Sequence, residues 1–475
     1  MDRGSPKSFE RSLFCRRHVQ SPLSTAISLK LNVQPPLAVV WQALKFVHTK
    51  TQGAKKYFVL LSLYLGSRIV TFAAPGDENW DSNFGVPGAS APVSVMAVVG
   101  QTLYAGGRFW QIGEVDAYNI AQWDGTNWSP LGLGVDGPVT AIVASGSDLY
   151  VGGSFSQAGD IPAANIAKWD GTNWSALGSG IDGNRSVKLA VVGDKLFAGG
   201  LFSSAGETAA TNIAMWDGSS WTNLGDGVNG QVTALAADGT NLYVGGGFTR
   251  AGSVAAKYVA HWDGKCWSPM GDPDIHLPAA IRLKGSEVFL FGNGGSSVFQ
   301  PAVISRWDGF TWNQIARFSP EGCLECKADT RDMIILGDDF YLLMPGLGKW
   351  DGTNLVGLGS GSSVPNPPPL SGSVVSLASN GSELFVGGDF SWAGGKPSSN
   401  IALWHIPHAL SASRSENVLT LSWPATGTNF ILESSKSLSQ ADWAEVPQTP
   451  IVNGNKLTVT NEVLSTQKFY RLRRR

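Results

Sequence analysis

Leu149-Tyr150-Val151-Gly152-Gly153-Ser154-Phe155 is followed by Asn165-Ile166-Ala167-Lys168-Trp169-Asp170-Gly171, and this pair of strings recurs along the chain. Copies surround Tyr104, Phe197 and Tyr243, and more divergent copies surround Phe289, Tyr341 and Phe385. The tryptophan of the Trp-Asp-Gly element stands at positions 123, 169, 216, 262, 307 and 350, so the spacings are 46, 47, 46, 45 and 43 residues. A period of this size is typical of propeller blades or of a solenoid.

The composition of one repeat unit favours a propeller blade. Thr140–Ser145 and Leu149–Phe155 are alternating or apolar runs joined by a Gly-Ser-Asp turn. Ile166–Trp169 and Trp174–Leu177 flank Asp-Gly-Thr-Asn, which is a strong hairpin signal. Four short antiparallel strands make one blade. Because such a sheet cannot bury both faces by itself, its Tyr, Trp and Leu side chains are expected to pack on the neighbouring blades.

The two ends of the repeat array indicate a closed ring. The seventh unit stops after Trp404, where His405 replaces the aspartate, and it lacks both the Asp-Gly hairpin and the outer strand. Trp80–Gly88 supplies the missing strand ahead of the first unit. Sharing one blade between both ends removes exposed sheet edges. We therefore expect an all-β protein whose main body is a seven-bladed β-propeller closed by an N-terminal strand.

The repeat resembles that of exported bacterial proteins with Gly-Gly and Trp-Asp-Gly elements, and more loosely kelch-type propellers and the fungal cortical cell-polarity marker. The resemblance spans about residues 77–406 and implies the fold but no activity. After His408 the pattern changes, and the tail is similar to a fibronectin-III-like module. We therefore expect a propeller over residues 75–408 and a small β-sandwich-like module over residues 411–475. Five short strands are predicted in that module: Val418–Trp423, Phe430–Glu433, Trp443–Val446, Lys456–Thr460 and Phe469–Leu472.

Residues 1–74 are expected to be a targeting region. Lys55-Lys56 precede the apolar run Tyr57–Leu65 and a stretch that ends in small residues, which fits a signal peptide over residues 55–74. Arg68 argues against a membrane-spanning helix, and an uncleaved anchor is the alternative. Residues 1–54 are expected to be a leader upstream of a true start near Lys55. The mature protein would be secreted or held at the cell surface, with no integral membrane span.

Charge is distributed unevenly along the chain. Residues 1–74 hold 11 Lys and Arg against 2 Asp and Glu, which leaves 24 against 35 for residues 75–475 and a net charge of −11 there. Nucleic acids and anionic lipids are bound by basic clusters. We therefore exclude nucleic acid as a partner.

The cysteines and the recurring polar residues point to structure rather than to metal binding. Cys323-Leu324-Glu325-Cys326 lacks the second ligand pair of a structural zinc site, and in an exported chain we expect Cys323 to pair with Cys326, or one of them with Cys266. The oxygen-rich stretch Asp77–Asn83 lacks the bidentate carboxylate of a calcium loop. No metal and no cofactor are expected.

Two sets of polar residues recur in the units, and turn chemistry is the expected reason. The aspartates of the Trp-Asp-Gly elements are Asp124, Asp170, Asp217, Asp263, Asp308 and Asp351. The asparagines that begin the third strand are Asn119, Asn165, Asn212 and Asn400, for which an Asx turn is the expected structure.

Loop lengths indicate which face of the propeller binds ligands. The second–third and blade-to-blade connections are long and varied, and they lie on one face, called here the long-loop face. Units one and seven, neighbours after closure, carry Trp110 and Trp392 there, where other units have Ser, Gln, Thr or Arg. Arg108 and Asp389 stand close by, and these four are the candidate ligand-binding residues. Trp with charged neighbours suits stacking on a sugar or anchoring a protein, although each Trp covering its own loop is the alternative.

A second irregular region is the insertion Phe318–Thr330 beside the shortened loop of unit six. The chain carries no G-x-S-x-G elbow, no phosphate-binding glycine loop and no histidines at metal-ligand spacing. We therefore expect a non-catalytic exported binding, adhesion or scaffold protein for a glycan or an extracellular protein. A secreted carbohydrate-active enzyme stays open because paired carboxylates are not local in sequence, as does a structural envelope component.

Overall fold

The computed structural model describes residues 77–183, 186–294, 301–318, 330–344, 346–358, 370–407, 410–415, 418–424, 430–435, 443–453, 456–462 and 468–474. The expected leader, the signal peptide over residues 55–74, and the pair Cys323 and Cys326 lie outside these ranges. The described residues form β-strands almost throughout, and their only helical element is the 3-10 turn η1 (Asp77–Asn79).

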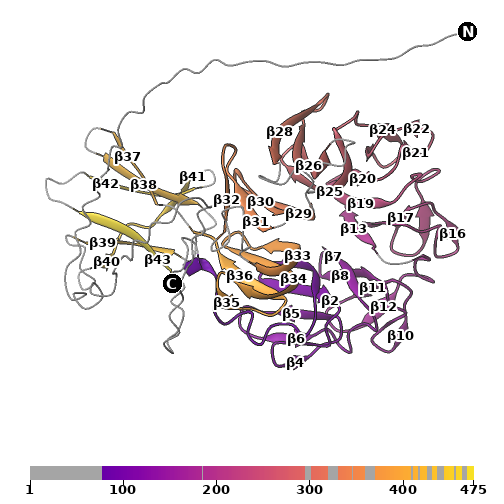
Figure 1. Cartoon of the computed structure of the whole chain (residues 1–475), viewed down its shortest axis with the longest axis horizontal. Coiled ribbons are helices and arrows are strands. Elements are labelled where there is room, and N and C mark those ends of the chain that lie inside the picture. Colours follow the sequence, from indigo (N-terminus) through magenta and orange to yellow (C-terminus); the bar gives the residue numbers. More distant parts are fainter. Residues whose placement is uncertain are drawn as a thin grey trace, which may run out of the picture. The chain divides into compact units, whose positions relative to one another are not determined.

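Four-stranded antiparallel sheets follow one another along the chain (Figure 1). The first is β1 (Val93–Val99), β2 (Thr102–Gly107), β5 (Ile120–Trp123) and β6 (Trp128–Pro130). The second is β7 (Val139–Ser145), β8 (Asp148–Gly153), β11 (Ile166–Trp169) and β12 (Trp174–Ala176). The third is β13 (Lys188–Val192), β14 (Lys195–Gly199), β17 (Ile213–Trp216) and β18 (Trp221–Asn223). The fourth is β19 (Val232–Asp238), β20 (Asn241–Gly246), β23 (Val259–Trp262) and β24 (Trp267–Pro269).

Three more sheets continue the series within the described ranges. The fifth is β25 (Ile275–Lys284), β26 (Glu287–Gly294), β27 (Ala302–Trp307) and β28 (Trp312–Phe318). The sixth is β29 (Asp332–Leu336), β30 (Asp339–Met344), β31 (Gly346–Trp350) and β32 (Leu355–Gly357). The seventh is β33 (Leu370–Ser379), β34 (Glu383–Ala393) and β36 (Ile401–His405), with β35 (Lys396–Pro397) paired to the end of β34. Each sheet coincides with one unit of the sequence repeat and is a propeller blade.

Small hairpins fill the second–third connections of the first four blades. They are β3 (Gln111–Ile112) with β4 (Val115–Asp116), β9 (Gln157–Ala158) with β10 (Ile161–Pro162), β15 (Ser204–Ala205) with β16 (Thr208–Ala209), and β21 (Arg250–Ala251) with β22 (Val254–Ala255). A glycine follows the first strand of each hairpin (Gly113, Gly159, Gly206 and Gly252) and turns the chain back over the outer strand. In blade 2, Gly159 has a φ of 59°, and a Cβ there would lie 3.0 Å from the Trp174 ring.

Tryptophans join blades 2 to 5 each to the blade before it. Trp169 and Trp174 are cross-strand partners whose rings are 5.2 Å apart, and the Trp174 indole donates to the Leu131 carbonyl of blade 1 at 2.9 Å. The same bond recurs further along the ring, from Trp221 to Leu177, from Trp267 to Leu224 and from Trp312 to Met270. Each indole ring packs on its own blade, and its N–H bonds to the blade before it. Burying the ring therefore also fixes the position of that neighbouring blade.

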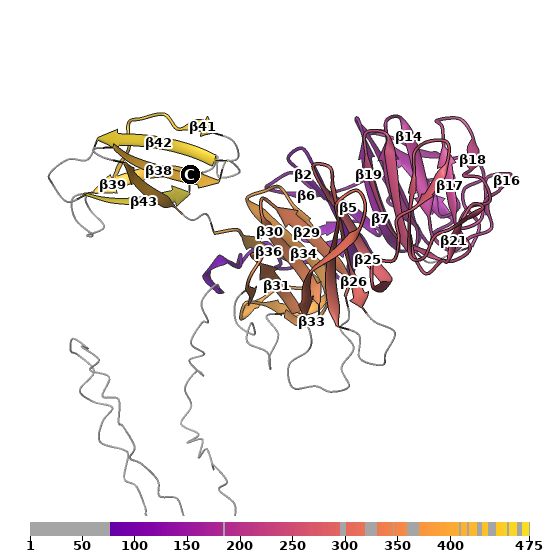
Figure 2. The same ribbon diagram turned by 90° about the horizontal axis from the view of Figure 1, so that it is seen from above.

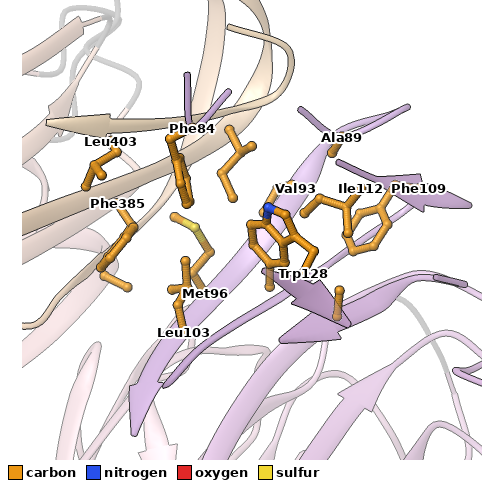
Figure 3. Packing of buried hydrophobic residues seen from close by; sticks show 14 of the residues in the cluster. Phe84, Ala89, Val93, Met96, Leu103, Phe109, Ile112, Trp128, Phe385 and Leu403 are labelled. Carbon is orange, nitrogen blue, oxygen red and sulfur yellow. The ribbon is translucent and has the colours of Figure 1, made fainter. Parts of the chain in front are cut away.

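The ring closes through residues ahead of the first blade. Trp80 forms an antiparallel bridge with Trp404, and the Trp80 indole donates to the Leu358 carbonyl of blade 6 at 2.9 Å. Phe84 lies between Phe385 and Leu403 of blade 7 and Trp128 of blade 1 (Figure 3). Both ribbon views place the orange blade 7 beside the indigo blade 1 (Figures 1 and 2). The segment before β1 thus occupies the place of the missing outer strand, as the sequence predicts.

The described residues after Leu410 form two further antiparallel sheets. One is β37 (Ser411–Ser415), β38 (Val418–Pro424), β42 (Lys456–Glu462) and β41 (Ile451–Asn453), and the other is β40 (Ala444–Glu445), β39 (Phe430–Ser435) and β43 (Phe469–Arg474). Both sheets contribute to a hydrophobic cluster that contains Leu421, Trp423 and Leu432. Two of these strands, β37 and β41, are not among the five predicted strands. Polar Ser411–Ser415 gives no apolar alternation from which a strand can be predicted.

Candidate functional site

The recurring polar residues have structural roles. In each hairpin the aspartate accepts two backbone N–H bonds, as Asp170 does from Thr172 and Asn173, so the predicted turn chemistry is confirmed. The recurring asparagines differ from the predicted Asx turn. Asn165 has a φ of 63°, and its side chain donates to the Ile181 carbonyl in the segment leading to the next blade. Asparagine can adopt this left-handed backbone conformation, and here its side chain also forms a hydrogen bond between successive blades.

One segment links the two hairpins that carry the candidate tryptophans. The Ala89 N–H donates to the Ser399 carbonyl of blade 7 at 2.9 Å, and the Asn400 amide donates to the Ala89 carbonyl at 2.8 Å. On its other side Ala89 forms a β-bridge with Ile112 of blade 1. The next residue, Ser90, accepts the Trp110 N–H at its hydroxyl at 3.1 Å. This segment, residues 85–90, is called here the seam, and blades 1 and 7 hold it between them.

Both candidate tryptophans are exposed; Trp110 adjoins the seam through Ser90, whereas Trp392 precedes Ala393, which pairs with Leu370 of β33. Trp110 follows the buried Phe109 and is 56% exposed, and Trp392, which pairs with Pro397 in β34–β35, is 48% exposed. Nearly every other tryptophan ring of the propeller is buried or half-buried in blade packing. These two side chains do not serve the packing for which the repeat uses tryptophan.

Sequence reasoning missed two further exposed apolar residues, one in the seam and one whose carbonyl accepts the Val135 N–H of the segment leading to blade 2. Tyr118, on the hairpin of Trp110, is 56% exposed, and Val86 in the seam is 50% exposed. The signal was available for Tyr118, because blades 2, 3 and 4 have Ala164, Thr211 and Lys257 at that position.

Arg108 and Asp389 hold equivalent positions in blades 1 and 7. Each is exposed and directly precedes the buried phenylalanine of its blade. Among the described residues neither side chain forms a hydrogen bond or an ion pair. Their charges are therefore available to a ligand.

A second site, absent from the sequence predictions, is the central channel. It is a cavity of about 230 Å³ lined by the innermost strands of all seven blades, β1, β7, β13, β19, β25, β29 and β33. Its charged residues lie on blades 3, 5 and 6 and are Lys188, Arg282, Arg331 and Asp332. Other blades line the channel with residues such as Ser94, Thr140 and Thr233.

The charges in the channel are unequally satisfied. Asp332 forms an ion pair with Arg282 and accepts N–H bonds from Met333 at 2.8 Å and Leu377 at 3.2 Å. Lys188 forms no hydrogen bond or ion pair with the described residues. Burial lowers the pKa of the Lys188 ammonium, and the Arg282 guanidinium lowers it further, against the opposing effect of Asp332.

The remaining sequence candidates fall elsewhere. Cys266 is exposed and unpaired, so the alternative disulfide through it is absent from the structure. In the oxygen-rich stretch, the Asp81 carboxylate accepts N–H bonds from Asn83 and Phe84 and lies 3.3 Å from His405 Nε2. Asp81 therefore belongs to the ring closure. The described residues include no helix with the length and hydrophobicity of a membrane span.

Comparisons with known proteins support the fold. The family model described as the Rax2 C-terminal beta propeller domain matches residues 115–289. Together with the sheet topology, this similarity shows that the chain is a β-propeller protein. No curated protein matches the chain.

Two solved structures are similar at low identity. The extracellular domain of a putative hybrid two-component system from B. thetaiotaomicron is 13% identical with a TM-score of 0.45, and the match covers 77% of this chain and 47% of that one. The acylaminoacyl peptidase of Pyrococcus horikoshii is 10% identical with a TM-score of 0.39, covering 73% of this chain and 59% of that one. This chain therefore spans about half the length of each of these proteins.

Proposed function

We propose that the protein is an exported, non-catalytic binding protein that takes a glycan at the seam on the long-loop face. In this account residues 55–74 are a signal peptide, and residues 411–475 are a separate fibronectin-III-like module. The observation that carries the proposal is the exposure of Trp110 and Trp392 on two hairpins that share the segment 85–90. Half-exposed indoles offer flat apolar faces for sugar rings, and Arg108 and Asp389 offer hydrogen bonds to hydroxyls.

A glycan fits these residues better than a large protein interface does. A stable protein interface needs a fully buried apolar centre of several adjacent residues. The exposed apolar residues at the seam are separated by polar ones, such as Ser90 and Gln111 on one side and Ser391 on the other. Scattered aromatic faces between polar groups are suited to stacking with hydrogen bonding around the ring edge.

A carbohydrate-active enzyme is less well supported than a binding protein. Glycoside hydrolysis commonly uses two carboxylates on either side of the scissile bond. In the described lining of the channel, Asp332 is the only carboxylate, and Arg282 and two backbone N–H groups already engage it.

The test begins with a glycan array probed with the full chain, followed by calorimetric titration of the strongest glycan. Trp110→Ala and Trp392→Ala are measured singly and together, with Phe310→Ala as the control. Phe310 is 88% exposed in the Asp-Gly hairpin, which belongs to the opposite face. Each stacked ring contributes on the order of 1 kcal/mol, so the double variant should bind at least about tenfold more weakly.

Two results would contradict this proposal. One is unchanged affinity in a folded double variant, and the other is an equal loss in Phe310→Ala. The chain could instead bind an extracellular protein and no glycan. If the double variant abolished that binding, the seam would still be the binding site, but its ligand would be a protein.

A further inference from the structure

The charged side chains that line the central channel are mostly cationic, whereas residues 75–475 as a whole have a net negative charge. The described lining of the channel carries three cationic side chains, Lys188, Arg282 and Arg331, against the single carboxylate of Asp332. Residues 75–475 have 24 Lys and Arg against 35 Asp and Glu. A narrow, low-dielectric cavity focuses the field of the charges that line it. The sign of the channel is therefore a local property of these few residues.

Lys188 is the residue whose charge the protein leaves uncompensated. Asp332, the carboxylate that could neutralise it, already accepts Arg282 and two backbone N–H groups. The described residues place no oxygen within hydrogen-bond or ion-pair distance of the Lys188 ammonium. Lys188 is half-buried, and a partly desolvated cation without a partner is unfavourable, so burial lowers the pKa of Lys188. Such a group is stabilised by an anion that enters from solvent.

The dimensions of the cavity restrict what can enter. The volume of the channel cavity is about 230 Å³. Pockets for larger organic ligands measure about 300–1,000 Å³. Hydroxyls of Ser94, Thr140 and Thr233 line the cavity together with the cations. The site thus has the size and the donors for a small oxyanion.

We propose that the central channel binds a small oxyanion, a phosphate or a carboxylate such as that of a sugar acid, with Lys188 as its principal ligand. Lys188 on blade 3 lines the same cavity as Arg282 on blade 5, so the anion is held between blades far apart in the sequence. Arg282 is not the principal ligand, because its guanidinium already forms an ion pair with Asp332. Its role is to position the anion.

The experiment titrates the full chain with inorganic phosphate and with D-glucuronate by calorimetry at constant ionic strength, and D-glucose is the neutral comparison. We expect one site for phosphate, glucuronate or both, and none for glucose within the channel. Lys188→Met should weaken anion binding at least tenfold, and Lys188→Arg should retain most of it. Lys195→Met is the matched control, because Lys195 belongs to the same blade and is exposed.

Thermal unfolding gives a second readout. Without anion, Lys188→Met should unfold at a higher temperature than the unsubstituted chain, because it removes an uncompensated charge. Phosphate should raise the midpoint of the unsubstituted chain and leave that of Lys188→Met unchanged. The proposal is overturned if neither anion binds at millimolar concentration, if Lys188→Met binds as well as the unsubstituted chain, if Lys195→Met loses binding equally, or if Lys188→Met fails to fold.

Discussion

Trp80 and Trp404 are 324 positions apart in numbering, yet their backbones form the antiparallel bridge that completes blade 7. The contact repeats the Trp169–Trp174 pairing within blade 2, with the outer tryptophan supplied by the other end of the domain. The Asp81 N–H donates to the Leu403 carbonyl at 2.9 Å, and the Lys396 ammonium donates to the Trp80 carbonyl. Closure is thus made by the same strand pairing that builds the ordinary blades.

Trp80→Ala should strongly destabilise the propeller. The Trp80 side chain is 1% exposed, and its indole N–H bonds to Leu358 of blade 6. Truncating a buried tryptophan costs about 3–5 kcal/mol, and denaturant unfolding measures the loss. Trp110→Ala, at an exposed tryptophan, should change the free energy of unfolding by no more than about 0.5 kcal/mol. Equal effects of the two substitutions would refute a packing role for Trp80.

Gly394→Ala should cost more than Gly100→Ala. Both glycines have positive φ, 54° and 61° respectively, so each alanine pays a left-handed conformational cost of roughly 1–2 kcal/mol. A Cβ at Gly100 meets no atom within 4 Å, whereas at Gly394 it would lie 2.1 Å from Trp80 Cδ1. Thermal unfolding of both variants isolates the steric contribution. In the Trp80→Ala background the difference between them should largely disappear, because the clashing ring is gone.

The hairpin aspartates should make the propeller sensitive to acid. Backbone N–H groups of Thr311 and Phe310 lower the pKa of Asp308 to about 2, below the roughly 3.9 of an unfolded chain. A carboxyl whose folded pKa is depressed contributes stability above its unfolded pKa, and that contribution is lost as the pH falls through the folded pKa. The temperature of the unfolding midpoint should therefore decrease as the pH is lowered from about 4 to about 2.

Asp308→Asn tests the origin of that loss. An asparagine can accept the same turn bonds, as Asn380 does from Ser382 and Glu383, but it carries no titrating charge. The decrease in midpoint from pH 5 to pH 2.5 should be smaller in this variant than in the unsubstituted chain. An identical pH dependence would assign the acid sensitivity to other groups.

Features that repeat, or that fill a gap in the repeat, could be predicted from the sequence. The blade strands follow from periodic apolar residues and Asp-Gly turns, and Trp80 follows from the missing outer strand. The two-residue strands β3 and β4 could not be predicted, because so short a strand has no periodicity. The asparagines form side-chain bonds to residues distant in sequence, 16 positions away for Asn165 with Ile181 and 311 for Asn400 with Ala89, and such partners cannot be inferred from local turn rules.

The residues of the first candidate site could be predicted from the sequence, and those of the second could not. Trp110 and Trp392 stand out because they break a repeat, and their role in binding stays a prediction. Lys188, Arg282 and Asp332 come from three units and meet only because the ring brings the inner strands together. Irregular pairing on the first strands, such as the register shifts in β25, further hides which residues face the channel.

Closure of the ring by the N-terminal strand is the central claim, because it defines the seam that joins the two blades carrying Trp110 and Trp392. Deletion of Glu78–Gly88 from the full chain tests it most directly, with thermal unfolding as the measurement. The deletion removes Trp80 and Phe84 and leaves β36 as an unpaired edge strand. We predict loss of the cooperative propeller transition and aggregation of the deleted chain. A deleted chain that stays monomeric and unfolds at the same midpoint as the full chain would contradict closure by this strand.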